Sequence, residues 1–149
     1  RIKNLAEYQI EKEKFEISPN NFWEEKASTF NWNQKWNDVV NWDFNSADIK
    51  WFSGGKLNIT ENCLDRHLKS KGDQVAIKWV SNNPKEKNID LTYNELFDQV
   101  CKFSNVLRKN GVKKGDRICL YMPMVPELAI AVLACVLVGS ILSKSELGQ

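Results

Sequence analysis

The sequence predicts an α/β protein, in which an irregular, aromatic-rich N-terminal arm over residues 1–57 precedes the first, incomplete part of a layered α/β domain over residues 58–143. Two observations support this division. Five of the six tryptophans fall within the arm, which has few aliphatic runs. From Gln74 onward, segments typical of strands alternate with helical segments, as in a sheet covered by helices. We expect residues 144–149, which are mostly polar, to form a divergent tail.

Within the arm, two short helices are expected before a segment without a regular period. Residues 2–14 are predicted to form a polar helix, and Pro19 is placed where a second helix begins. Over residues 31–52 an aromatic side chain recurs every few positions, with neither a strand period nor a helix period. We interpret the arm as an irregular segment whose rings pack on a neighbouring surface. A small self-contained aromatic core is the alternative.

The start of the domain carries the signals of one helix and two strands. Thr60 is expected to cap a helix that runs to about Lys69 and ends at Gly72. A β-branched run over residues 74–80 predicts a strand, and residues 89–91 predict a second, shorter strand after a polar turn.

A capping box opens the next predicted helix. Thr92 and Glu95 have the spacing in which each side chain bonds the backbone N–H of the other. Apolar residues then recur on one helical face as far as Leu107, and Asn110-Gly111 ends the helix.

The last predicted elements are a strand, a helix and the beginning of another strand, in a parallel or mixed sheet. Residues 117–121 form the strand after a turn at Lys114-Gly115-Asp116, and Pro126 is placed where a helix begins. Residues 128–138 are apolar all round, so we expect this helix to be buried on every side. The following strand is expected to be cut to Ile141-Leu142, which leaves a sheet edge and apolar surface uncovered and favours self-association.

Charge, length and cysteine spacing exclude several classes of partner. The chain has 21 basic and 19 acidic side chains and a formal net charge of +2, which gives no electrostatic reason to expect nucleic acid or anionic lipid. The apolar run over residues 128–142 is about 15 residues long and is interrupted by Gly139-Ser140, whereas a bilayer span needs about 20. The four cysteines form no C-x-x-C pair, and a reduced, cytoplasmic setting is the simplest account of them.

Gly54-Gly55-Lys56 superficially suggests a phosphate-binding loop. A Walker loop would also need Gly at position 50 and Ser or Thr at position 57, where the chain has Lys50 and Leu57. We therefore interpret this segment as a bend.

Cys63 and His67 lie one helical turn apart and share a predicted helix face, as two ligands of a zinc site would. Zinc needs four ligands, and no second pair exists because His67 is the only histidine. A structural role is therefore favoured. Because His67 is the only histidine and a structural role is favoured for it, the sequence offers no plausible Ser-His-Asp triad.

Asp116-Arg117 and the turn at residues 122–127 are the most distinctive local features, because this turn joins the end of a strand to the start of a helix. Ligands of open α/β sheets favour the carboxyl ends of strands. Two prolines in the turn instead favour a rigid connection, and we prefer that interpretation because no Gly-rich loop lies nearby.

With these motifs in order, residues from about 20 to 139 resemble the AMP-forming acetyl-CoA synthetases of the adenylate-forming superfamily. The segments that carry the resemblance are Phe22-Trp23-Glu24, Trp51-Phe52-Ser53-Gly54-Gly55-Lys56-Leu57-Asn58, Asn62-Cys63-Leu64-Asp65-Arg66-His67, Leu91-Thr92-Tyr93-Asn94-Glu95-Leu96, Phe103-Ser104-Asn105-Val106-Leu107, Lys114-Gly115-Asp116-Arg117 and Tyr121-Met122-Pro123-Met124-Val125-Pro126-Glu127-Leu128. The second and third of these segments indicate the branch that acts on acetate or propionate.

The resemblance implies the N-terminal part of an acetate–CoA ligase, with residues 58–143 as the start of its AMP-binding domain. Such an enzyme converts ATP, acetate and coenzyme A into acetyl-CoA, AMP and pyrophosphate, and uses Mg²⁺. The resemblance ends after Gly139, so the phosphate loop, acyl pocket and catalytic lysine of the family have no counterpart here. We therefore assign no catalytic, cofactor-binding or metal-binding residue, and expect this part alone to be inactive.

Three other interpretations compete with this one. The first is a propionate-preferring synthetase, and the second is a non-enzymatic module that pairs with a full-length synthetase through its aromatic arm. The third is a small nucleotide-binding α/β protein, which would need a phosphate loop that the sequence does not contain.

Overall fold

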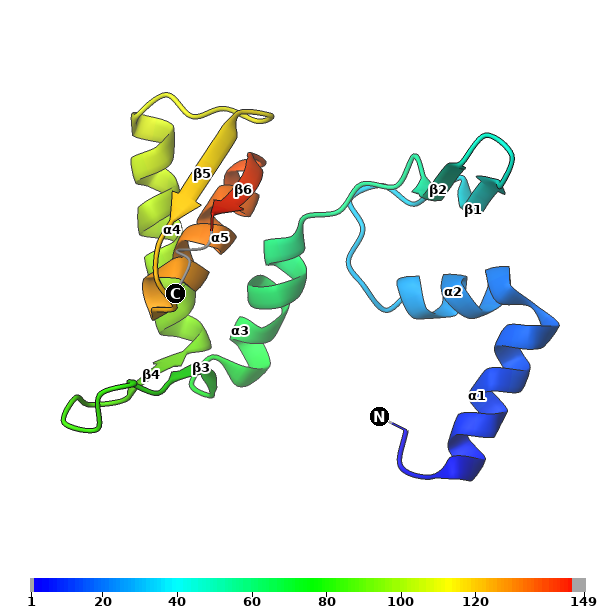
Figure 1. Ribbon diagram of the computed structural model, residues 1–149, viewed down its shortest axis with the longest axis horizontal. Helices are drawn as coiled ribbons and strands as arrows, with labels where there is room; N and C mark the ends of the chain where they lie inside the picture. Colours follow the sequence, from blue (N-terminus) through cyan, green and yellow to red (C-terminus); the bar gives the residue numbers. More distant parts are fainter. Residues whose placement is uncertain (1, 146–149) are drawn as a thin grey trace. The chain divides into compact units, whose positions relative to one another are not determined.

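The computed structural model describes residues 2–145, and the chain divides into two compact units, residues 1–57 and residues 58–149 (Figure 1). We call them the N-terminal unit and the C-terminal unit. Among its described apolar side chains, the N-terminal unit buries only Ala27 and Trp36. The two units therefore have cores of different kinds.

The N-terminal unit begins with the helices α1 (Leu5–Ile17) and α2 (Pro19–Ala27). The Asn4 side chain caps α1 by accepting a hydrogen bond from the Glu7 N–H at 2.9 Å. Pro19 occupies the first turn of α2, where a missing N–H costs nothing. An ion pair of 2.6 Å between Lys26 Nζ and Glu11 Oε2 links the two helices.

A β-hairpin of β1 (Asp38–Asp43) and β2 (Asp48–Ser53) completes this unit. The expectation of an irregular segment over residues 31–52 is therefore wrong for both strands. Val40 lies opposite Trp51, and Trp42 lies opposite Ile49; such pairs of a β-branched and an aromatic residue stabilise an antiparallel ladder. Each strand also carries two consecutive apolar residues, which hides the two-residue period in the sequence.

Aromatic rings form the centre of the N-terminal unit. The centroid of the Trp36 ring lies 4.8 Å from that of Trp32 and 5.1 Å from that of Phe52. These three rings pack on one another, as the alternative of a self-contained aromatic core describes, and packing of the arm on a neighbouring surface stays a prediction. Trp42 and Phe44, near the hairpin turn, are instead 61% and 81% exposed.

The C-terminal unit opens with a π-helical turn, η1 (Glu61–Asp65), that continues into α3 (Arg66–Lys71). The expected cap at Thr60 is wrong, because its side chain accepts no capping hydrogen bond. Asn58 fills this role, since its Oδ1 accepts hydrogen bonds from the Thr60 N–H at 2.9 Å and from the Thr60 hydroxyl at 2.6 Å. The predicted helix end at Gly72 is confirmed.

The next elements are β3 (Val75–Trp79), β4 (Ile89–Thr92) and α4 (Tyr93–Lys109). The two strands pair antiparallel, and the predicted capping box is present. The Glu95 N–H donates to Thr92 Oγ1 at 3.2 Å, and the Thr92 N–H donates to the Glu95 carboxylate at 2.8 Å. Hydrogen bonds from Thr92 also hold the pKa of Glu95 below its ordinary value. The helix ends at Asn110, as predicted.

A parallel β–α–β unit follows, made of β5 (Arg117–Tyr121), α5 (Pro126–Val138) and β6 (Ile141–Ser145). The expectation that the last strand stops at Leu142 is wrong, because its backbone pairs with β5 from Ile141 to Ser145. Within residues 2–145 the strands form three two-stranded sheets, and the expected single sheet is not formed. No helix in this range combines the length and apolarity of a membrane span.

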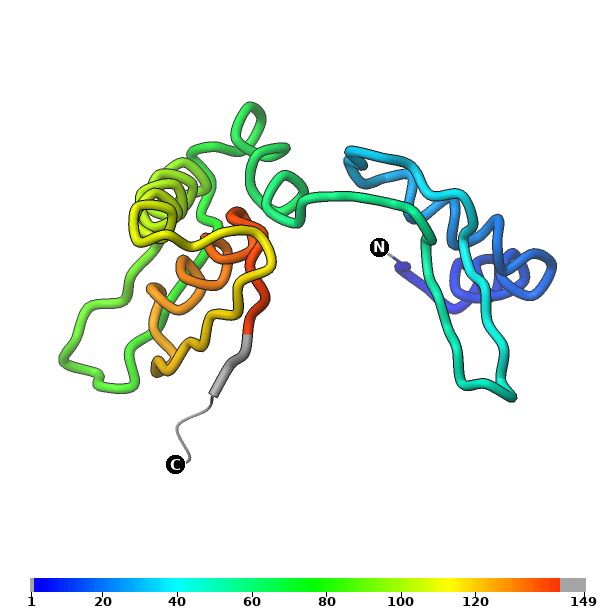
Figure 2. The backbone as a smooth tube through the Cα atoms, turned by 90° about the horizontal axis from the view of Figure 1, so that it is seen from above, coloured from blue at the N-terminus to red at the C-terminus, as the bar shows by residue number. Residues whose placement is uncertain are grey.

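Aliphatic side chains on both sides of α5 form the core of the C-terminal unit. Helix α4 lies beside α5 (Figures 1 and 2). Val100, Ala134 and Cys135 are 0% exposed. Within α4, the buried Ser104 hydroxyl donates to the Val100 carbonyl at 2.8 Å. Burial of α5 on every side is not observed, because five residues in the second half of the helix are only half-buried: Val132, Leu133, Val136, Leu137 and Val138.

Candidate functional site

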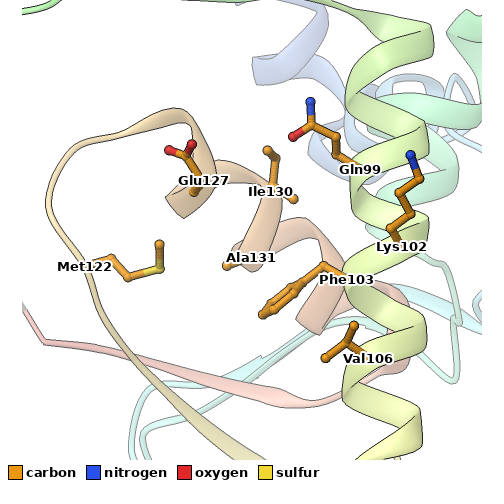
Figure 3. Close-up of a pocket in the computed structure, with 8 residues that line it drawn as sticks. All are labelled: Gln99, Lys102, Phe103, Val106, Met122, Glu127, Ile130 and Ala131. Carbon is orange, nitrogen blue, oxygen red and sulfur yellow. The ribbon is translucent and has the colours of Figure 1, made fainter.

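A pocket of about 420 Å³ opens between α4 and α5, where the chain leaves β5 (Figure 3). Its walls come from two stretches of the sequence: the middle of α4, and the continuous stretch made of the loop after β5 and the first turns of α5. The lining residues are Gln99, Lys102, Phe103, Val106, Met122, Glu127, Ile130 and Ala131.

Helix periodicity explains how α4 and α5 build the pocket walls. Phe103 and Val106 are three residues apart on α4, and Glu127 and Ile130 have the same spacing on α5, so each pair lies on one helix face. Figure 3 shows the Phe103 ring of α4 directed toward α5, with Met122 on the opposite side of the hollow. The interior is therefore apolar, and the polar groups lie at its rim.

A hydrogen bond from another strand holds the loop after β5 in place. The indole N–H of Trp79, the last residue of β3, donates to the Met124 carbonyl at 2.8 Å. Within the loop, the Val125 N–H donates to the Pro123 carbonyl at 2.9 Å. The interpretation of this segment as a rigid turn agrees with these contacts, and the turn also borders the pocket.

The chemistry of the lining suits contact with apolar groups. Lys102 Nζ lies 2.5 Å from Asp98 Oδ2, so its charge is already paired. Among residues 2–145, no ion pair or hydrogen bond engages the Glu127 carboxylate. A polyphosphate needs several cations and backbone N–H donors around it, and the pocket lining does not supply them.

Gly54-Gly55-Lys56 forms a turn that returns the chain from β2 to the loop before β1. The Lys56 N–H donates to the Gln34 carbonyl at 2.9 Å, and the Gln34 N–H donates back to the Lys56 carbonyl at 3.0 Å. A Cβ added at Gly55 would lie 2.6 Å from the Trp32 ring. The same Cβ would lie 2.9 Å from the Phe52 carbonyl oxygen, so close packing on the ring and on the backbone together explains the glycine.

Cys63 and His67 lie on the η1–α3 segment, where no third metal ligand joins them. No cluster of three or more His, Cys, Asp or Glu side chains suited to a metal occurs among the described residues. The His67 ring instead packs on Tyr93, with centroids 5.3 Å apart. Burial raises the pKa of the Cys101 and Cys135 thiols, which disfavours the nucleophilic thiolate.

Asp116 closes the turn before β5. Its carboxylate accepts a hydrogen bond from the Lys113 N–H at 2.7 Å, and its carbonyl accepts one from the Ile141 N–H at 2.8 Å. Asp116 therefore anchors the β5–β6 pair, and its neighbour Arg117 is exposed.

The sequence did not predict the pocket itself. The helical period places Gln99, Phe103 and Val106 on one face of α4. This shared face is the feature of the sequence from which one wall of the pocket could have been predicted. The opposing wall depends on the packing of α5, which the sequence pattern does not specify.

Comparison with known proteins assigns both units to characterised families. Residues 8–63 match the family described as acetyl-coenzyme A synthetase N-terminus, and residues 64–144 match the family described as AMP-binding enzyme. The chain is 50% identical to an acetyl-coenzyme A synthetase of Saccharophagus degradans over 124 residues, which cover 83% of this chain and 19% of that protein. It is 45% identical to the corresponding Stutzerimonas stutzeri protein over 142 residues, which cover 94% and 22%.

A solved structure gives the same result for the fold. The acetoacetyl-CoA synthetase of Streptomyces lividans superposes with a TM-score of 0.76 at 26% identity, over 87% of this chain and 20% of that one. The chain thus spans about a fifth of the length of the curated relatives it matches. It belongs to the AMP-binding enzyme family, and it corresponds to the N-terminal part of the family's acetyl-coenzyme A synthetases.

Proposed function

We propose that this chain is the N-terminal part of an acetate–CoA ligase. The complete enzyme would join acetate to AMP with release of pyrophosphate, and would then transfer the acetyl group to coenzyme A. The observation that carries the proposal is the uninterrupted succession of the two family matches, from residue 8 to residue 144. The relatives are named acetyl-coenzyme A synthetases, which favours acetate over propionate and an enzyme part over a separate interaction module.

ATP, coenzyme A and Mg²⁺ would be bound mainly outside this chain. Adenylation needs cations and donors placed around a polyphosphate, and the turn at residues 54–56 does not resemble such a loop. The role of the C-terminal unit would then be structural, with α4, α5 and the β5–β6 pair beginning the domain on which the rest of the enzyme is built.

A cytoplasmic setting is part of the same proposal. The four cysteines are all unpaired, and Cys63 and Cys119 are exposed. Exposed free thiols suit a compartment that keeps them reduced.

A chimaera tests the proposed function. Residues 1–149 would replace the matching region of the S. degradans synthetase, and acetate-dependent pyrophosphate release would be measured with ATP and Mg²⁺. We expect activity from the chimaera and none from the 149-residue chain alone. Release above the no-protein control by the chain alone, or a folded chimaera without activity, would contradict the proposal.

A further inference from the structure

We propose that Asn110, at the end of α4, is the asparagine of this chain that deamidates first, and that the cap of the helix controls the rate of the reaction. Asn110-Gly111 is the only Asn-Gly pair in the sequence, and both residues are exposed. In such a pair the backbone nitrogen after the asparagine reaches the side-chain amide carbon easily, because glycine has no side chain to obstruct the approach. The modification needs only water and is independent of the proposed function.

The chemistry takes place between two neighbouring groups of the same chain. The Gly111 nitrogen loses its proton and forms a bond to Asn110 Cγ, while the Cγ–Nδ2 bond breaks and ammonia leaves with one added proton. The product of this step is a five-membered succinimide ring. Water then opens the ring at either of its carbonyl carbons, which gives aspartate or isoaspartate without any oxidant or reductant.

The cap of α4 keeps the attacking nitrogen occupied. The Gly111 N–H donates to the Arg108 carbonyl at 3.0 Å, and the Val112 N–H donates to the Leu107 carbonyl at 3.1 Å. These two bonds are those of a Schellman motif, which places a glycine in the left-handed conformation just after the helix. Gly111 has that conformation, with a φ of 86°. The reacting N–H is therefore a structural donor as long as the cap is closed.

The conformation of Asn110 holds the two reacting atoms apart as well. At its ψ of 12° the Gly111 nitrogen is nearly eclipsed with the Asn110 nitrogen, whereas ring closure needs it eclipsed with Asn110 Cβ. The side-chain Nδ2 also donates to the Val106 carbonyl at 2.8 Å. The last turn of the helix must therefore open before the ring can form, and such opening is a low-energy event at a helix end.

Neither product can rebuild the cap. An aspartate side chain has no N–H to donate to the Val106 carbonyl, and its negative charge is unfavourable at the C-terminus of a helix. Isoaspartate adds a carbon atom to the main chain before Gly111, so the bonds of the motif lose their spacing. Leu107, which packs against both aliphatic clusters, lies in this last turn. Deamidation should therefore loosen the end of α4 where it supports the core.

Ageing of the purified 149-residue chain at neutral pH tests the proposal. A peptide of residues 104–117, too short to hold a stable helix in water, gives the rate without the cap. Val112→Pro removes one donor of the motif and leaves the Asn-Gly pair intact, and Lys109→Ala is the matched control in the same turn. Samples would be digested with pepsin in acid, where deamidation is slow, and analysed by mass spectrometry with fragmentation that distinguishes isoaspartate.

We expect Asn110 to be modified before any other asparagine of the chain, and at least about tenfold more slowly than in the peptide. A tenfold difference corresponds to an opening free energy of about 1.4 kcal/mol. Val112→Pro should raise the rate toward that of the peptide, and Lys109→Ala should leave it unchanged. Earlier modification of another asparagine, or equal rates in the chain and the peptide, would overturn the proposal even if Val112→Pro does not fold.

A second pair of variants tests the effect of the modification on the helix. Asn110→Asp reproduces one product, and Asn105→Asp adds the same charge at an exposed position of α4, more than one turn before its end. Hydrogen exchange of the Gly111 and Val112 amides, corrected for the intrinsic rates of the two sequences, should become at least about tenfold faster in Asn110→Asp alone. Unchanged exchange in Asn110→Asp, or equal acceleration in both variants, would contradict the role given to the Asn110 side chain.

Discussion

The two units of this chain are stabilised by different kinds of contact. The N-terminal unit depends on ring-to-ring packing and on surface ion pairs, with Trp36 as its largest buried side chain. The C-terminal unit has two aliphatic clusters around α5, one of them centred on Leu64 and Val100. Aromatic pairs add about 0.5–1.5 kcal/mol beyond the area that they bury, and exposed ion pairs add about 0–1 kcal/mol. The C-terminal unit should therefore be the more stable one.

Hydrogen exchange gives the largest expected difference between the units. Amides in a well-packed core are protected up to the global stability of a domain, about 5–15 kcal/mol. We expect amides of residues 2–52 to exchange several orders of magnitude faster than the core amides of residues 92–138. Hydrogen exchange measured by NMR or mass spectrometry checks this expectation. Equal protection of the amides in both units would contradict the expected difference in stability.

A core truncation would show whether the units unfold independently. Leu64 is 2% exposed, and Leu64→Ala should destabilise the C-terminal unit by about 2–5 kcal/mol because it leaves a cavity. Urea unfolding followed by the exchange of α4 amides measures the loss.

The matched control is Leu57→Ala, since Leu57 is 39% exposed. A partly exposed site loses less on truncation, about 1 kcal/mol or below. Equal losses from both variants, or a loss of protection in α1 and α2 caused by Leu64→Ala, would show that the units are coupled.

Gly55→Ala tests the packing of the N-terminal unit. The added methyl group would meet the Trp32 ring at 2.6 Å, and such overpacking costs about 1–3 kcal/mol. In a Trp32→Ala background the cost should be smaller, because the ring that it strikes is gone. A thermodynamic cycle from denaturant unfolding measures the coupling, and additive effects would count against ring packing as the reason for the glycine.

The smallest expected effect is the pH response of the α1–α2 contact. Hydrogen bonds from Lys26 and Lys14 lower the pKa of Glu11 from 4.5 to about 2. A lowered pKa in the folded protein means that the carboxylate stabilises the N-terminal unit above about pH 4.5, and that this contribution is lost as the pH falls toward 2. Carboxyl NMR of Glu11 checks the value. Lys26→Ala should shift the pKa toward 4.5, and an unchanged titration would exclude this ion pair as its cause.

The predictions from sequence succeeded where local chemistry determines the structure. The capping box at Thr92 and the helix end at Asn110 are set by neighbouring residues, and both were found. The hairpin of β1 and β2 was missed because apolar residues on both faces conceal its period, and its turn lacks a glycine. Instead, the Asp43 carboxylate accepts hydrogen bonds from the Asn45 N–H and the Ser46 hydroxyl.

Tertiary contacts explain the remaining differences. The last strand extends to Ser145 because β5 offers a full row of pairing partners, whatever the polarity of the residues added. The pocket was not predicted, because it depends on how closely α4 and α5 approach each other. The buried Ser104 hydroxyl of α4 also donates to the Ala134 carbonyl of α5 at 3.3 Å. This contact shows how close the two helices lie, but it follows from the fold and could not be predicted from the sequence.

Trp79 gives the C-terminal unit a built-in optical probe. Of the six tryptophans, five lie within residues 1–57, and Trp79 is the sixth. Its indole N–H donates to the Met124 carbonyl beside the pocket between α4 and α5, and the emission of an indole depends on such a bond and on the water around it. A chain that keeps Trp79 and carries phenylalanine at the other five positions would therefore signal, through its colour of emission, any change in the loop after β5.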